Sequence, residues 1–128
     1  MKNILVCFVC LILNSCSFNY DTSYYFENKT IDTIDIEFHN KKNDIITIKV
    51  SPNSNYLFLR VAGILSGPSK MSLNYNDSIF IFKNDKTIKY YRDNDLENQI
   101  YDMNNWPLTK AINNIYEYTY TFNEADFN

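Results

Sequence analysis

The chain has 128 residues, with 12 basic and 15 acidic residues and a formal net charge of −3. The mild acidity and the lack of a long run of Lys or Arg exclude a surface built to follow nucleic-acid phosphates. The length is that of one domain, large enough to form a hydrophobic core without disulfides or metals.

The first 15 residues have the pattern of a secretory signal peptide. Lys2 supplies a positive start, and residues 4–13 form an apolar run without a charge. The run is about ten residues long, whereas a transmembrane helix needs roughly 20. We therefore expect residues 1–15 to be removed rather than kept as a membrane span.

A short motif, Leu13-Asn14-Ser15-Cys16, follows the apolar run and resembles the lipobox of bacterial lipoproteins. The alternative is an ordinary signal peptide cut elsewhere, but no A-x-A-like site follows the run. The resemblance implies that the sulfur of Cys16 carries a diacylglycerol and that Cys16 becomes the acylated N-terminus. Two or more acyl chains anchor a protein stably to a membrane. The mature chain then keeps neither a free thiol nor a disulfide, because Cys7 and Cys10 leave with the signal.

Residues 16–22 read as a lipidated N-terminus with a short tether, and residues 23–128 as the folded domain. In the domain apolar residues recur at every second position, which is typical of half-buried strands. Polar turns separate the runs, with Asn40 to Asn43 as one example. The expected strands are residues 24–26, 34–38, 46–50, 56–61, 78–82, 88–91 and 116–122.

About seven short strands at this spacing predict an all-β fold, an antiparallel two-sheet sandwich with an immunoglobulin-like layout. A small closed barrel is the alternative. The run 78–82 is apolar on both faces, so we place it centrally in a sheet. The tyrosines of 116–122 are expected to pack into the core. Residues 92–114 read as a long connection, in which 107–114 has the composition for one or two helical turns behind Pro107.

Three patterns of the body resemble a group of small Bacteroidota lipoproteins. They are Asn28-Lys29-Thr30, Asp77-Ser78-Ile79, and residues 118–122 followed by Glu124-Ala125-Asp126-Phe127. The resemblance implies a β-sandwich in the cell envelope, and it brings no activity. It also implies O-glycosylation at Asp-(Ser/Thr)-aliphatic triplets, which makes Thr33 and Ser78 candidate acceptors.

Residues suited to catalysis or metal binding are few. His39 is the only histidine, and we expect a solvated strand-end side chain because no nucleophile motif accompanies it. Asp93, Asp95 and Glu97 alternate like the start of a calcium loop, but Asn98 replaces its required glycine. We therefore expect no enzyme, no cofactor and no metal site.

Aromatic residues in the irregular regions are better candidates for binding. Tyr75, Tyr101 and Trp106 are expected to be exposed there. The leading hypothesis is a non-enzymatic binding or structural module, anchored by lipid to the outer membrane, with the periplasmic side favoured. Its partner would be an envelope protein or a glycan, contacted by residues 62–77 or 92–114. The alternative is a periplasmic inhibitor of a hydrolase such as a lysozyme.

Overall fold

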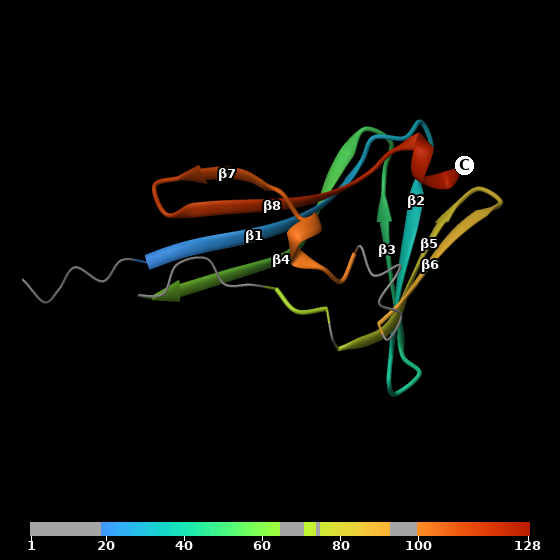
Figure 1. Cartoon of the computed structure of the whole chain (residues 1–128), viewed down its shortest axis with the longest axis horizontal. Coiled ribbons are helices and arrows are strands. Elements are labelled where there is room, and N and C mark those ends of the chain that lie inside the picture. The colour runs from blue at the N-terminus through green and yellow to red at the C-terminus, as the bar shows by residue number, and fades with distance from the viewer. Residues whose placement is uncertain (1–18, 65–70, 74, 93–99) are drawn as a thin grey trace, which may run out of the picture.

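The computed structural model describes residues 19–64, 71–73, 75–92 and 100–128. These residues form two sheets of four strands, with the order β4-β1-β8-β7 in sheet A and β3-β2-β5-β6 in sheet B. The strands of sheet A run along the long axis of the molecule, and those of sheet B cross it steeply (Figure 1). The elements are β1 (Asn19–Asn28), β2 (Ile34–Asn40), β3 (Ile45–Val50), β4 (Ser54–Ile64), β5 (Asn76–Lys83), β6 (Lys86–Tyr91), the 3₁₀ turn η1 (Met103–Asn105), β7 (Leu108–Ile112), β8 (Ile115–Phe122) and the 3₁₀ turn η2 (Glu124–Phe127).

The predicted two-sheet sandwich is confirmed, because the strands belong to two separate sheets rather than to one closed barrel. None of the helical segments in the described ranges has the length and apolar character needed to cross a membrane.

Sheet B is built from two hairpins, both of which the sequence predicted. β2 pairs with β3 and β5 pairs with β6, and β2 and β5 join the hairpins in antiparallel register. The β2–β3 loop comprises residues 41–44, and its third residue, Asn43, has φ 63°, as is common where a type I turn is followed by a left-handed residue. β5 lies between β2 and β6, which confirms the central place expected for residues 78–82.

Sheet A has β1 at its centre, antiparallel to β4 and parallel to β8. β1 begins at Asn19, inside the segment 16–22 that we expected to be tether. The reason is packing: Thr22 is fully buried, and the residues on both sides of it pair with β4. The folded domain therefore begins earlier than the sequence indicated.

The edge of sheet A corrects the expectation of helical turns in residues 107–114. This segment forms β7 and the start of a hairpin with β8, in which Ile112 faces Ile115. Asn113 and Asn114 have φ values of 51° and 63°, so they form a two-residue turn of type I′. Asparagine is one of the few residues that adopts this left-handed conformation readily.

The hydrophobic core lies between the sheets and is rich in aromatic rings. The ring of Phe26 on β1 lies 5.2 Å from that of Phe58 on β4 and 6.0 Å from that of Phe122 on β8. Tyr118 stacks on Tyr24 at 5.4 Å, which confirms the inward packing expected for the terminal strand. With the core filled by these inward side chains, sites for binding are left to the outer faces of the sheets and to the loops.

Candidate functional site

The outward side of sheet B carries aromatic side chains in an unusual number. Along β2 and β5 the inward residues are almost fully buried, and the residues between them point away from sheet A. In the middle of this outward side the register places Phe80 beside Glu37 on β2 and Lys89 on β6. We define the aromatic face by its four rings, which belong to His39, Phe80, Phe82 and Tyr91.

Phe80 is the ring that each of the other three rings of the aromatic face contacts. Its ring centroid lies 4.5 Å from that of His39, 5.8 Å from that of Tyr91 and 6.5 Å from that of Phe82. The ammonium group of Lys89 lies over the same ring at 5.3 Å from its centroid, which is within reach of a cation–π interaction. The four rings therefore form a connected platform along β5 and its neighbours.

Polar and charged groups surround the platform. Lys49 donates to Asp35 at 2.9 Å, and Nε2 of His39 lies 3.1 Å from a carboxylate oxygen of Glu37. His39 is thus half-buried between a ring and a carboxylate, which corrects the expectation of a solvated side chain. The platform offers apolar area with hydrogen-bonding groups at its rim, which is the usual composition of a recognition surface.

A second, polar hollow lies on the outward side of sheet A. It has a volume of about 450 Å³. Tyr25 is one of its lining residues and lies opposite Thr119 on β8. Thr121 donates to Glu27 at 2.7 Å and Lys110 donates to Glu117 at 2.9 Å, so both carboxylates of the hollow already have a hydrogen-bond partner. The lining residues are Tyr25, Glu27, Asn55, Thr109, Lys110, Glu117 and Thr119.

The two carboxylates of this hollow are too far apart to act as a hydrolytic pair. Glu117 lies opposite Ser23, and Glu27 is four positions further along β1. Each position of a strand advances about 3.3 Å, which separates the two residues by roughly 13 Å. Glycosidases place their two carboxyl groups about 5–9.5 Å apart. Glu27 and Glu117 therefore do not form such a pair.

Shifted pKa values mark structural positions in this protein. Burial raises the pKa of the hydroxyls of Tyr24, Tyr90 and Tyr120, so these groups stay protonated inside the core. The hydrogen bond from Arg60 lowers the pKa of Asp21 on the neighbouring strand. These groups lie in the core and on sheet A, away from the aromatic face.

The three aromatics singled out in the sequence are placed differently from one another. The expectation for Trp106 is wrong: it is only 2 % exposed, because its ring fills the space beside Phe26 and its Nε1 donates to the carbonyl of Ile100 at 2.9 Å. Tyr101 is half-buried against the core. Tyr75 is 83 % exposed, which confirms its exposure and leaves its binding role a prediction.

The predicted modification sites also differ in accessibility. Thr33 is exposed in the connection between β1 and β2, whereas Ser78 is 8 % exposed within β5. Glycosylation at either residue stays a prediction. Cys16, the acidic stretch 93–97 and parts of the segments 62–77 and 92–114 lie outside the described residues.

Within the ranges that the structure covers, no cluster of three or more His, Cys, Asp or Glu residues is arranged to hold a metal ion. Comparisons of the chain with protein-family models, with curated proteins and with solved structures find no match. The function is therefore argued from the surfaces themselves.

Sequence reasoning missed the aromatic face, although a signal for it was present. The run 78–82 is apolar at every position from Ile79 to Phe82. In a two-layer sandwich a strand has only one covered face, so alternate residues of such a run must point outward. Phe80 and Phe82 are those residues.

Proposed function

We propose that this protein is a lipid-anchored, non-enzymatic binding module of a bacterial cell envelope, and that it binds through the aromatic face. The observation that carries the proposal is the connected set of rings around Phe80 on the outward side of a central strand. The anchor is the acylated Cys16 implied by the lipobox resemblance. The partner is a glycan or an envelope protein.

Phenylalanines that are only half-buried on the outer face of a sheet need a reason, because apolar area open to water raises the risk of aggregation without adding to the core. Phe80 and Phe82 lie side by side on a central strand, where an edge position cannot explain them. Aromatic platforms supply large contact area with little loss of side-chain freedom when a partner binds. The charged rim at Asp35 and Lys49 supplies hydrogen bonds to polar groups of that partner.

The inhibitor alternative would place its contacts on residues 62–77 or 92–114. Parts of both segments lie outside the described residues, so this function stays a prediction. It is checked by adding the protein to a panel of muramidases and measuring the loss of lytic activity at equal molar ratio.

The binding proposal is tested with a double variant, Phe80→Ser with Phe82→Ser, and a matched control, Tyr25→Ser, on the outward side of the other sheet. The probes are purified peptidoglycan in a co-sedimentation assay, an array of neutral and acidic glycans, and solubilised envelope proteins. Removal of central interface aromatics typically costs about 2 kcal/mol or more, which is roughly 30-fold in affinity.

We expect the double variant to lose at least that factor while Tyr25→Ser keeps wild-type binding. Far-UV circular dichroism checks that both variants fold. Loss of binding in Tyr25→Ser alone would move the site to the polar hollow of sheet A. Equal binding by all three proteins would refute the aromatic face as the contact surface.

Anchoring and location are tested separately in intact cells. Cys16→Ala should release the protein from the membrane fraction and abolish acylation. Protease added to intact cells should cleave the wild-type body only if the body faces outward. Protection until the outer membrane is opened would support the periplasmic side. Unchanged membrane association of Cys16→Ala would refute the lipid anchor.

A further inference from the structure

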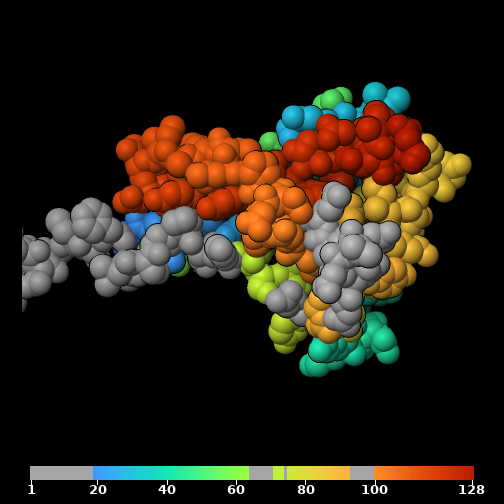
Figure 2. Space-filling model, in the orientation of Figure 1, coloured from blue at the N-terminus to red at the C-terminus, as the bar shows by residue number. Residues whose placement is uncertain are grey.

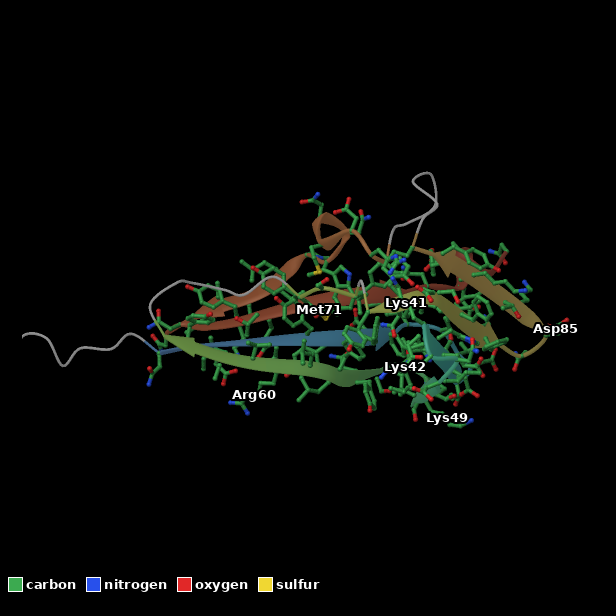
Figure 3. All side chains as sticks on the ribbon, turned by 90° about the horizontal axis from the view of Figure 1, so that it is seen from below. Lys41, Lys42, Lys49, Arg60, Met71 and Asp85 are labelled. Atoms are coloured by element: carbon green, nitrogen blue, oxygen red, sulfur yellow. The ribbon has the colours of Figure 1, made fainter. Side chains whose placement is uncertain are left out.

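The tip of the β2–β3 hairpin combines exposed apolar and basic side chains. We define the hairpin tip by Lys41, Lys42, Ile45, Ile46 and Tyr75. The hairpin projects from the lower end of sheet B, as the teal atoms of Figure 2 show. Figure 3 views the molecule from this lower side and labels both lysines.

Two isoleucines of the hairpin tip are exposed on both sides of one strand. Ile45 is 55 % exposed and Ile46 is 61 % exposed. Ile45 lies opposite His39 and Ile46 lies opposite Phe38, so their side chains point to opposite faces of the sheet. Ile46 points toward the inner side, but β3 is the edge strand of its sheet and Ile46 stays uncovered there. Both isoleucines therefore leave more than half of their apolar surface open to water.

Tyr75 completes the apolar part of the tip from a different segment. It directly precedes β5, whose first residue, Asn76, lies opposite Asn40 at the start of the loop. A hollow of about 450 Å³ lies between Tyr75 and the loop, and it is lined by Asn40, Lys41, Lys42, Asp44 and Tyr75. The space is large enough for a small polar group such as a lipid headgroup.

The charge of the tip is opposite to that of the chain. The chain has a net charge of −3, whereas the loop carries Lys41 and Lys42 against the single carboxylate of Asp44. That carboxylate is already engaged, since it accepts from the side-chain amide of Asn40 at 3.1 Å. The tip is therefore locally positive and complementary to an anionic surface.

We propose that the hairpin tip is a second membrane contact, which docks onto anionic lipid headgroups with Tyr75 and the two isoleucines at the interface. Lysines bind anionic headgroups, and aromatic side chains prefer the boundary between headgroups and acyl chains. A surface of this kind fits a lipid layer better than a folded partner, because the two isoleucines point to opposite faces of one projecting hairpin.

The contact rests on the proposed lipid anchor, which makes a weak second contact effective. A tethered module needs little intrinsic affinity, because the anchor keeps the tip at a high local concentration near the bilayer. β1 begins at one end of the long axis, and the tip projects sideways near the other end (Figure 1). Docking of the tip would therefore hold the long axis along the membrane.

The test uses the acylated full chain in vesicles whose lipids carry bromine near the headgroup. Tyr75→Trp places a fluorescent reporter at the tip, and Ile31→Trp places a matched reporter on the opposite side of the molecule, where Ile31 is 77 % exposed. The buried Trp106 gives the same background in both variants and is subtracted with the wild-type signal. The vesicles contain either phosphatidylcholine alone or equal parts of phosphatidylcholine and phosphatidylglycerol.

We expect strong quenching of the Tyr75→Trp reporter on anionic vesicles only, and little quenching of the Ile31→Trp reporter on either. Each lysine near an anionic surface contributes about fivefold, so Lys41→Gln with Lys42→Gln should lower the ratio of docked to undocked protein by about 25-fold. Raising the salt concentration should weaken the quenching in the same direction.

The outcomes separate the tip from the anchor. Flotation with phosphatidylcholine vesicles reports the anchor alone, and its failure would count against the proposed function and not against the tip. Quenching that is equal for both reporters, or equal on both kinds of vesicle, would overturn the tip proposal. Absence of quenching on anionic vesicles would overturn the tip proposal too, and would favour a protein as the partner of this surface.

Discussion

The burial of Trp106 is a direct test of the core, because the sequence predicted an exposed side chain and the structure buries it. In the structure its ring centroid lies 5.1 Å from that of Phe26 and 5.4 Å from that of Tyr120, and its Nε1 donates to the buried carbonyl of Ile100. Truncating a buried tryptophan to alanine costs about 3–5 kcal/mol. The carbonyl left without a partner adds about 1 kcal/mol. Trp106→Ala should therefore lower the free energy of unfolding by roughly 4–6 kcal/mol.

This loss is comparable with the whole stability of a small domain, which is about 5–15 kcal/mol. Urea unfolding followed by far-UV circular dichroism measures it, with Tyr75→Ala as a matched control that should cost less than about 0.5 kcal/mol. Trp106→Phe keeps most of the volume and should lose about 2 kcal/mol. In the wild-type protein the emission of Trp106 should be protected from acrylamide. A cost below about 1 kcal/mol for Trp106→Ala would refute the burial of this ring.

Three further predictions concern an ion pair, a turn and a strand edge. Lys83 donates to Glu124, and this hydrogen bond lowers the pKa of the Glu124 carboxyl below its ordinary value of 4.5. The stability that the ion pair contributes is complete above pH 4.5, and it is lost as the pH falls through the lowered pKa. Urea midpoints at a series of acidic pH values should therefore fall less steeply for Glu124→Gln than for the wild type, and identical slopes would contradict the pair. Asn114 has φ 63°, so Asn114→Ala should cost about 1 kcal/mol in thermal unfolding and Asn114→Gly should cost clearly less; equal costs would argue against the left-handed turn. A side chain at Gly63 would collide with the ring of Tyr20 on the paired strand β1. Gly63→Val should therefore destabilise the fold by about 1–3 kcal/mol. In a double-mutant cycle, Tyr20→Ala combined with Gly63→Val should recover part of this loss.

The regular strands of sheet B could be read from the sequence because their signal is local. Alternation in 34–38 and 46–50 fixes which side chains point inward, and the polar loop between them fixes the register of the hairpin. A different local signal, an apolar run without alternation, placed 78–82 as a central strand. Prediction succeeded where the pattern within a few residues determined the structure.

The segment from Trp106 to Asn114 could not be read this way. Pro107 is acceptable both at the start of a helix and before an edge strand, and Leu108–Ile112 shows no alternation because every residue of β7 is exposed. The turn has Asn-Asn in place of the Asn-Gly that marks a type I′ hairpin most clearly. The burial of Trp106 depends on a ring from β1, far away in the sequence, and on a ring from β8, beyond the β7–β8 turn. Its environment is set by the packing of the sheets.

The two proposed contacts belong to the same sheet, and this sets their relative direction. The aromatic face lies on the outward side of β2, β5 and β6, and the hairpin tip is the end of β2 and β3. The side chains of the aromatic face point out from the plane of the sheet, whereas the hairpin tip projects along the strands, within that plane. If the tip touches the bilayer, the platform stands upright from the membrane and stays open to the aqueous side. A lipid-docked tip would therefore expose Phe80 and Phe82 to a glycan or protein, instead of burying them against the lipid.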